Sequence, residues 1–174
     1  MRYRRADVTG GRYFFTVNLA ERDKTLLVDY VDELRDAIKQ VKQRHPFEID
    51  AMVVLPDHLH AIWTLPHNDA DFSTRWGLIK AAFSRSIKLE ERISSSRQAK
   101  GERGIWQRRF WEHLIRNDDD FECHVNYIHY NPVKHGYVQA PSEWQWSSIH
   151  RFIKGGVLKK DWAIADDFDG HFGE

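Results

Sequence analysis

The alternation of apolar and polar residues along the chain predicts four strands. They cover residues 13–19, 47–55, 58–65 and 105–116. The first follows the Gly10-Gly11 turn and is rich in aromatic and β-branched residues, which suit a pleated surface. Pro56 and Asp57 form a tight turn between the second and third strands, so these two strands should pair as an antiparallel hairpin.

Apolar residues at helical spacing predict three helices. They cover residues 27–45, 75–93 and 117–131. The third begins at Asn117, and the three aspartates that follow place negative charge at the positive end of the helix dipole. Residues 94–104 should form a loop, and the chain beyond residue 131 lacks clear periodicity.

The resulting order is β-α-β-β-α-β, followed by one more helix. This is the order of a ferredoxin-like α+β fold, in which two helices cover one face of a four-stranded antiparallel sheet. The other face is left for a functional site or for the added C-terminal helix. Four apolar residues of the third strand should point toward the two helices: Leu59, Ala61, Trp63 and Leu65.

The composition fits a globular protein with one main domain. The chain has 174 residues, of which 41% are hydrophobic and 30% charged. We expect a domain over residues 1–152 and an acidic C-terminal tail over residues 153–174. The single cysteine, Cys123, excludes an internal disulfide and indicates a reducing, cytoplasmic location. No apolar run is long enough to cross a membrane, and no apolar segment follows the charged N-terminus as in a secretory signal.

Positive charge is concentrated although the net charge is zero, which excludes a uniformly basic nucleic-acid binder. Residues 75–116 contain eleven basic and four acidic side chains, and residues 1–12 contain four arginines and one aspartate. Residues 161–174 contain five acidic side chains and no Lys or Arg. A phosphate-binding groove would have such a basic stretch, although solvated helix faces often carry similar runs. Aromatic residues make up 13% of the chain and either fill a core or stack on unpaired bases.

His58 and His60 are the first candidates for chemistry. They lie two residues apart on the predicted third strand, so both side chains leave its open face, with Cα atoms about 6.6 Å apart. Two neutral imidazoles at that spacing can hold one divalent ion. The alternative is a pair of half-exposed histidines without a function.

The last predicted helix carries a second group of polar candidates. His124, Tyr127 and Asn131 follow one another at spacings of three and four, beside an apolar stripe. Tyr127 and Asn131 are one helical turn apart, so their side chains are neighbours on the helix surface. A tyrosine and an amide oxygen laid over the histidine pair would place a nucleophile beside a metal site. Taken alone, a helical tyrosine such as Tyr127 is more often a half-buried packing residue.

Four segments of the chain resemble one family. The sequence His58-Leu59-His60, followed by a helical tyrosine with an amide residue four positions later, resembles the HUH single-tyrosine transposases of the IS200 type. Three further segments resemble more narrowly the REP-associated tyrosine transposases: Gly10-Gly-Arg-Tyr-Phe-Phe-Thr-Val-Asn-Leu19, Tyr127-Ile-His-Tyr-Asn-Pro-Val-Lys-His-Gly136 and Trp144-Gln-Trp-Ser-Ser148. The resemblance extends from about Tyr3 to Phe152, and the ordered set of segments is far more specific than the histidine pair alone.

The resemblance implies a DNA transposase that acts on single strands as an endonuclease and strand transferase. Carried over by position, His58, His60 and Asn131 would bind Mg²⁺ or Mn²⁺, and Tyr127 would attack the scissile phosphate. The products would be a 5′-phosphotyrosine link to the enzyme and a free 3′-hydroxyl. Tyr130 is the rival nucleophile, but only Tyr127 has an asparagine four residues later.

The resemblance also implies a DNA substrate of hairpin-forming repeated palindromes with a short single-stranded recognition segment. REP-associated relatives resemble monomers, which we expect here, whereas IS200-type relatives resemble swapped dimers. The basic residues that could contact this DNA are Arg2, Arg4, Arg5, Arg12, Lys80, Arg85, Lys88, Arg103, Arg108 and Arg109. Phe14, Trp63 and Trp106 are candidate stacking platforms, with the protein core as the alternative place for each ring.

The sequence leaves two other functions open. One is a non-catalytic binder or repressor of DNA hairpins, which the presence of all the site residues does not favour. The other is a small metal-dependent hydrolase that activates water with His58, His60 and a third ligand such as His124, and that would not need Tyr127. An RRM-type RNA binder shares the sheet, but its aromatic motif is missing from this sequence.

Overall fold

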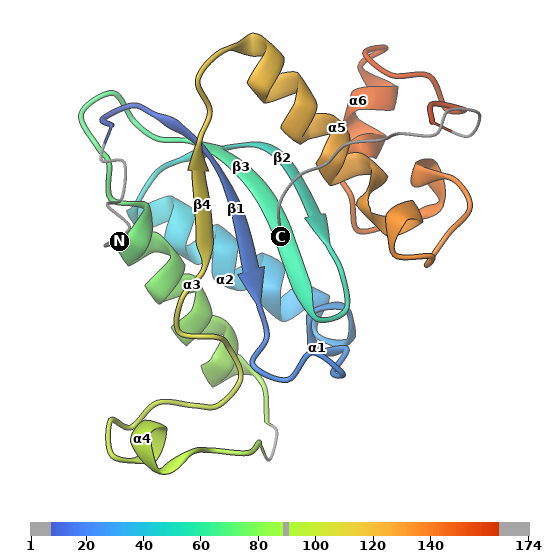
Figure 1. The fold of residues 1–174 in the computed structure, drawn as a ribbon. Helices are drawn as coiled ribbons and strands as arrows, with labels where there is room; N and C mark the ends of the chain where they lie inside the picture. Colours follow the sequence, from blue (N-terminus) through green and yellow to red (C-terminus); the bar gives the residue numbers. More distant parts are fainter. Residues whose placement is uncertain (1–7, 89–90, 164–174) are drawn as a thin grey trace, which may run out of the picture.

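The computed structural model describes residues 8–88 and 91–163, and this part of the chain contains one four-stranded sheet (Figure 1). The strands are β1 (Arg12–Asn18), β2 (Glu48–Val54), β3 (His58–Thr64) and β4 (Trp111–Leu114). They lie in the order β2-β3-β1-β4, and every neighbouring pair is antiparallel. This topology confirms the predicted ferredoxin-like α+β fold.

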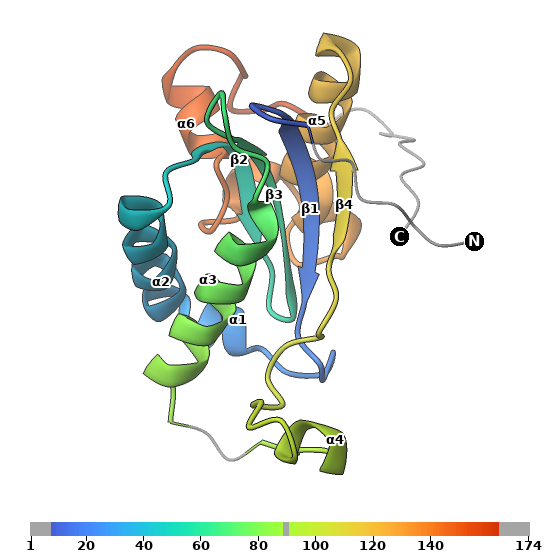
Figure 2. The same cartoon turned by 90° about the vertical axis from the view of Figure 1, so that its left-hand side faces the viewer.

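Helices cover both faces of the sheet. The long helices α2 (Val31–Arg44) and α3 (Phe72–Ser86) lie on one face, and α5 (Asp118–Lys134) lies on the other (Figure 2). The short helices α1 (Leu26–Asp29) and α4 (Ser95–Gln98) belong to the connecting segments. The main core, between the sheet and α2 and α3, includes the four β3 residues that were predicted to face it: Leu59, Ala61, Trp63 and Leu65.

A smaller apolar layer holds α5 on the opposite face. Its members are Phe14, Ala51, Val53, Leu55, Ile62, Val125, Tyr127 and Ile128. The helix starts as predicted, because the Asn117 side chain accepts a hydrogen bond from the Asp120 backbone N–H at 2.8 Å. It continues past the predicted end, through Pro132 to Lys134. The proline removes one donor, but the last turn still closes, since His135 N donates to Asn131 O at 3.0 Å.

The first two predicted helices differ from the observed ones at their N-terminal parts. The helix predicted over residues 27–45 is divided at Tyr30 into α1 and α2. The helix predicted to begin at residue 75 begins earlier, because the Asp71 side chain accepts a hydrogen bond from Thr74 N at 2.9 Å and caps α3.

The helix α3 also ends before its predicted end at residue 93. The backbone becomes extended at Ile87, and the side chain of this residue is buried in the main core. The Arg103 guanidinium donates to the carbonyl oxygens of Ser84 and Ile87, which have lost their helical partners. A residue distant in the sequence therefore stabilises the helix end.

The strand predicted over residues 105–116 pairs with β1 in two separate parts. The β4 ladder forms one part, and at the other end Trp106 makes an isolated bridge with Leu19. Residues 108–110 leave the ladder between these parts. The predicted strand was therefore too long: strand-favouring aromatic residues stand on both sides of Arg108 and Arg109, and the interruption falls at these two arginines and Phe110.

The chain after α5 covers the outer edge of β2. It contains the 3-10 helix η1 (Pro141–Glu143) and the helix α6 (Ile149–Lys154), so it is less irregular than the sequence suggested, and α6 runs across the expected boundary after residue 152. Ser148 N donates to Met52 O at 2.8 Å, and Ser148 Oγ accepts from Met52 N at 2.9 Å. These bonds satisfy backbone groups at a sheet edge. Among the residues that the structure describes, no helix is long and apolar enough to cross a membrane.

Candidate active site

The sheet face under α5 brings together the two histidines of β3. Their ring centroids lie 5.0 Å apart, and the ring of Tyr127 on α5 lies 5.2 Å from that of His60. The shared face agrees with the predicted alternation along the strand. The face is not open to solvent, however, because α5 covers it: His58 is 2% and His60 1% exposed.

One ring nitrogen of each histidine has a fixed neighbour. His58 Nδ1 lies 2.7 Å from Asp57 Oδ1, and the other oxygen of Asp57 accepts a hydrogen bond from Arg22. His60 Nδ1 lies 2.9 Å from Thr16 Oγ1. Such partners orient an imidazole and leave Nε2 for a ligand. Burial lowers the pKa of both histidines, and that of His60 lies well below its usual value, so both rings are neutral at pH 7.

Asn131 adds an amide on the facing helix. Among the described residues, no hydrogen-bond partner is found for the buried Nε2 atoms of His58 and His60 or for either amide atom of Asn131. Leaving a buried polar atom unpaired costs about 1–3 kcal/mol, so such atoms need a ligand or a functional reason. Two imidazole nitrogens and an amide oxygen form a donor set that Mg²⁺ or Mn²⁺ accepts.

Tyr127 lies one helical turn before Asn131, between His60 and the ammonium group of Lys134. Lys134 Nζ is 3.5 Å from Tyr127 Oη and 5.0 Å from the centroid of the tyrosine ring. The ring of Phe14 lies 6.0 Å away and supports the tyrosine from the sheet. The ammonium is therefore placed to stabilise negative charge on the tyrosine oxygen.

The residues near Tyr127 in the sequence go to different places. The ring of His135, just after α5, lies 5.1 Å from that of His58. His129 instead turns to the C-terminal segment, where its Nε2 lies 2.9 Å from Ser148 Oγ. Tyr130, the rival nucleophile, is half-buried and lies about 60° further round the helix.

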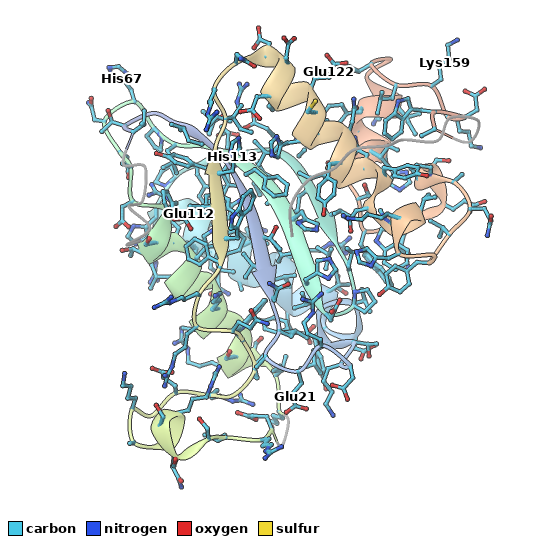
Figure 3. All side chains as sticks on the ribbon, viewed as in Figure 1. Glu21, His67, Glu112, His113, Glu122 and Lys159 are labelled. Carbon is cyan, nitrogen blue, oxygen red and sulfur yellow. The ribbon has the colours of Figure 1, made fainter. Side chains whose placement is uncertain are left out.

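His124 faces the sheet but belongs to a separate cluster near the start of α5. Its ring lies 4.7 Å from that of His113 on β4, the strand on which Figure 3 labels this residue. The Asp120 carboxylate lies 2.9 Å from His113 Nε2 and 3.1 Å from His124 Nδ1. Phe14 packs on both His124 and His60, with ring distances of 4.8 and 5.5 Å. His124 is therefore one ring removed from His60 and is not placed as the third ligand of the hydrolase alternative.

Comparison with known proteins points to one family. Residues 8–131 match the family described as transposase, IS200-like. The chain is also 49% identical over 161 residues to a REP-associated tyrosine transposase of Escherichia coli (strain K12), covering 92% of this chain and 90% of the relative. The chain belongs to the IS200-like transposase family. Its relatives are named tyrosine transposases, and this chain is a DNA transposase.

Two further similarities extend over almost the whole of this IS200-like transposase. A relative from Haemophilus influenzae is 48% identical over 162 residues, which are 92% of each chain. A solved structure of a REP-associated tyrosine transposase bound to a REP hairpin has a TM-score of 0.81 and 46% identity, and the match covers 99% of this chain and 98% of the other. The family resemblance predicted from the four sequence segments is thereby confirmed.

The basic residues predicted to contact DNA are scattered over this IS200-like transposase. Arg2, Arg4 and Arg5 lie outside the described residues. Lys80 and Arg85 belong to α3, on the sheet face opposite the histidines, and Lys88 follows that helix (Figure 2). Lys80 is largely buried and donates to Gln107 O at 3.0 Å, and this burial lowers its pKa to about 8.

The other predicted DNA contacts mostly have carboxylate partners within the chain. Arg12, Arg103 and Arg108 pair with Asp50 at 3.7 Å, Glu91 at 2.6 Å and Glu102 at 2.7 Å respectively. Arg109 is exposed just before β4. The three aromatic residues considered as stacking platforms, Phe14, Trp63 and Trp106, are all buried. All three rings therefore lie in the protein core, which was the alternative that the sequence left open.

Sequence reasoning missed the residues that support the site. Asp57 had a local signal, since it directly precedes His58, and Lys134 had a weaker one, seven residues after Tyr127 on the same helix. Thr16 and Arg22 had none, because their contacts depend on strand pairing and on the path of a distant loop.

Proposed function

We propose that this IS200-like transposase cleaves and rejoins single-stranded DNA beside hairpin-forming repeated palindromes through a covalent phosphotyrosine at Tyr127. His58, His60 and Asn131 would hold a Mg²⁺ or Mn²⁺ ion next to this tyrosine. The proposal rests above all on the buried polar atoms of these three residues, which lack partners within the described chain and lie on the two elements that also position Tyr127.

The three residues fit a divalent cation by their chemistry and by their protonation. Both imidazoles are neutral, and Asp57 and Thr16 orient them so that Nε2 is available. A cation bound there would polarise a non-bridging oxygen of the scissile phosphate and favour departure of the 3′-oxygen. If the oxygen of Asn131 held the cation, the two N–H groups of Nδ2 would remain to donate to the phosphate.

Tyr127 and Lys134 account for the transfer itself. Tyr127 Oη gives its proton to solvent and attacks the phosphorus, the bond from phosphorus to the 3′-oxygen breaks, and that oxygen takes a proton from solvent as the free 3′-hydroxyl. The Lys134 ammonium, 3.5 Å from Oη, stabilises the phenolate before attack and again when it leaves on rejoining. One phosphoester replaces another, so rejoining requires no ATP.

The relatives support the hairpin part of the proposal. The structural neighbour that is similar over nearly the whole chain is bound to a REP hairpin, and the Escherichia coli relative is named for its association with REP. A non-catalytic binder of the same DNA would not require a tyrosine beside unpartnered histidine and asparagine atoms. The complete set of residues therefore favours cleavage over binding alone.

A covalent-adduct assay tests this function. The substrate is a hairpin oligonucleotide with single-stranded extensions, incubated with Mn²⁺ and analysed on a denaturing gel. The wild-type protein should form an adduct and release a strand ending in a 3′-hydroxyl. Tyr127→Phe should bind the DNA but form no adduct, because only the nucleophilic oxygen is lost. Tyr130→Phe is the matched control and should retain the adduct.

Two further results bear on the metal and on the nucleophile. His60→Ala, like EDTA, should abolish the adduct while DNA affinity stays within several-fold, because phosphate contacts dominate binding. Full activity in EDTA would contradict the metal site. Mass spectrometry that places the nucleotide on Tyr130 would reassign the nucleophile, and cleavage without any adduct would favour the water-activating hydrolase.

A further inference from the structure

A row of aromatic rings crosses the site and reaches the surface at both ends. It runs from Trp111 through Phe14, His60, His58 and His135 to Tyr137, and neighbouring ring centroids are between 5.0 and 6.0 Å apart. Phe14, His60 and His58 in the row are buried, whereas His135 is exposed and the two end rings, Trp111 and Tyr137, are 44% and 43% exposed. Among the large apolar residues that are exposed in the described part of the chain, Trp111 and Tyr137 are the aromatic ones.

Trp111 is held rigidly on the β4 side of the site. It pairs in register with Thr16, the residue that bonds His60, so its backbone lies two strand spacings, about 10 Å, from the backbone of His60. Its ring is nearly parallel to that of His113, with centroids 5.9 Å apart and planes at 6°. His113 is in turn fixed by Asp120. An exposed indole with a fixed orientation offers a flat surface one ring, Phe14, away from Tyr127.

Tyr137 is held in the same way on the other side. Its ring stacks on Trp144, with centroids 5.3 Å apart and planes at 28°, and Trp144 Nε1 donates to Val54 O at 2.9 Å. On its inner side Tyr137 lies 6.0 Å from the ring of His135, which contacts His58. The two exposed rings therefore approach the histidine pair from opposite ends of the row.

We propose that Trp111 and Tyr137 are base-stacking sites that hold the single strand on opposite sides of the scissile phosphate. This inference rests on the proposed function. Unpaired bases of any identity stack on exposed aromatic rings. The phosphate between two bases stacked in this way would meet the Lys134 ammonium, which lies beside Tyr127. Because both rings are backed by other rings, the strand would be positioned without reorganising the protein.

The stacking sites also explain what the separate cluster near α5 does. His113, His124 and Asp120 do not join the histidine pair, yet they form a stacked and hydrogen-bonded support behind Trp111. The cluster thus serves as a rigid backing for the indole.

A cycle of protein and DNA changes tests the inference. Single abasic nucleotides are placed at each position around the cleavage site of the hairpin substrate. Affinity is measured by fluorescence anisotropy at fixed salt in a Tyr127→Phe background, which prevents cleavage. In that background an abasic nucleotide at one position on each side should weaken binding roughly tenfold, since stacking on an aromatic ring is lost.

Each stacking variant should remove the penalty on one side only. In Trp111→Leu, an abasic nucleotide on one side should weaken binding less than about twofold, whereas an abasic nucleotide on the opposite side should still weaken it roughly tenfold. Tyr137→Leu should show the reverse pattern. Trp111→Phe and Tyr137→Phe should keep both penalties, which separates stacking from misfolding. Leu78→Ala, an exposed residue on α3, is the matched control and should leave the abasic profile unchanged.

The outcomes separate this inference from the proposed function. If the wild-type protein forms no adduct with any hairpin DNA, the proposed function fails. If adducts form but the abasic profile is the same in Trp111→Leu, Tyr137→Leu and the parent protein, the stacking sites are wrong. Loss of sensitivity on the same side in both variants would overturn the placement of the two rings on opposite sides of the scissile phosphate.

Discussion

Asp57 gives the sharpest test of how the metal ligands are prepared. Its carboxylate joins the Arg22 guanidinium to Nδ1 of His58, at 2.7 Å from the latter. Burial alone would raise the pKa of Asp57, but the hydrogen bonds from Arg22 and His58 outweigh this and lower it, so the group is ionised at pH 7. Substituting Asp57→Asn removes the charge and retains an oxygen that accepts from His58.

The expected loss is one of metal affinity. Changes in a group that orients a metal-bound histidine reduce affinity about 10- to 100-fold, or about 1.4–2.8 kcal/mol. Asp57→Asn should lie near tenfold because the hydrogen bond survives, and Asp57→Ala near 100-fold because it does not. In both variants the Arg22 guanidinium, 3.5 Å from His58 Nδ1, loses the negative charge that compensates it. Its positive charge then further disfavours binding of the metal ion. Tyr127 and Lys134 are untouched, so saturating metal should restore the rate.

The assay is the rate of adduct formation as a function of Mn²⁺ concentration. The concentration that gives half the maximal rate should rise by these factors, while the maximal rate changes little. Asp32→Asn is the control for the loss of one carboxylate, since Asp32 pairs with Arg35 on α2, across the sheet. An unchanged half-saturating concentration, or a rate that metal does not restore, would refute the role given to Asp57.

His129 and Lys134 each give one more prediction. Burial, with the charge of Arg151, lowers the pKa of His129 from 6.5 to about 4, so as the pH falls the unfolded chain takes up a proton that the folded chain refuses. The unfolding free energy of the wild-type protein should therefore fall between pH 7 and pH 5, and in His129→Gln this fall should be smaller by about 2 kcal/mol. Urea titrations at the two pH values measure it, and an equal fall in both proteins would contradict the prediction. Lys134→Met should slow adduct formation about tenfold, because the ammonium beside Tyr127 Oη stabilises the negative charge of the attacking oxygen, whereas Lys134→Arg should retain most activity; an unchanged rate in Lys134→Met would exclude this role.

The sequence predicted the parts of the site that local periodicity determines. Residues two apart on a strand share a face whatever the neighbouring strands do, so His58 and His60 could be separated from the core residues of β3 before any pairing was known. The same holds for Tyr127 and Asn131, one turn apart on a helix. Pro132 follows Asn131 directly and lies within the last turn of α5 without ending the helix.

Longer-range contacts set what the sequence could not predict. The bond between Thr16 and His60 exists because β1 and β3 pair in one particular register. The end of α3 depends on Arg103, and the interruption before β4 depends on a bridge that Trp106 makes beyond it. Neither place carries a glycine or proline that would mark an end, so the prediction extended each element too far.

The two faces of the sheet have different tasks, and this division explains where the chemistry lies. The face toward α2 and α3 buries the large aromatic rings and most of the aliphatic core. The face toward α5 has a thin apolar layer, in which Phe14 and Ile62 meet Val125 and Ile128. Because the first face supplies most of the apolar burial, the second tolerates several unpaired polar atoms at about 1–3 kcal/mol each. The position of Tyr127 over the histidines then depends on how this thin layer seats α5 on the sheet.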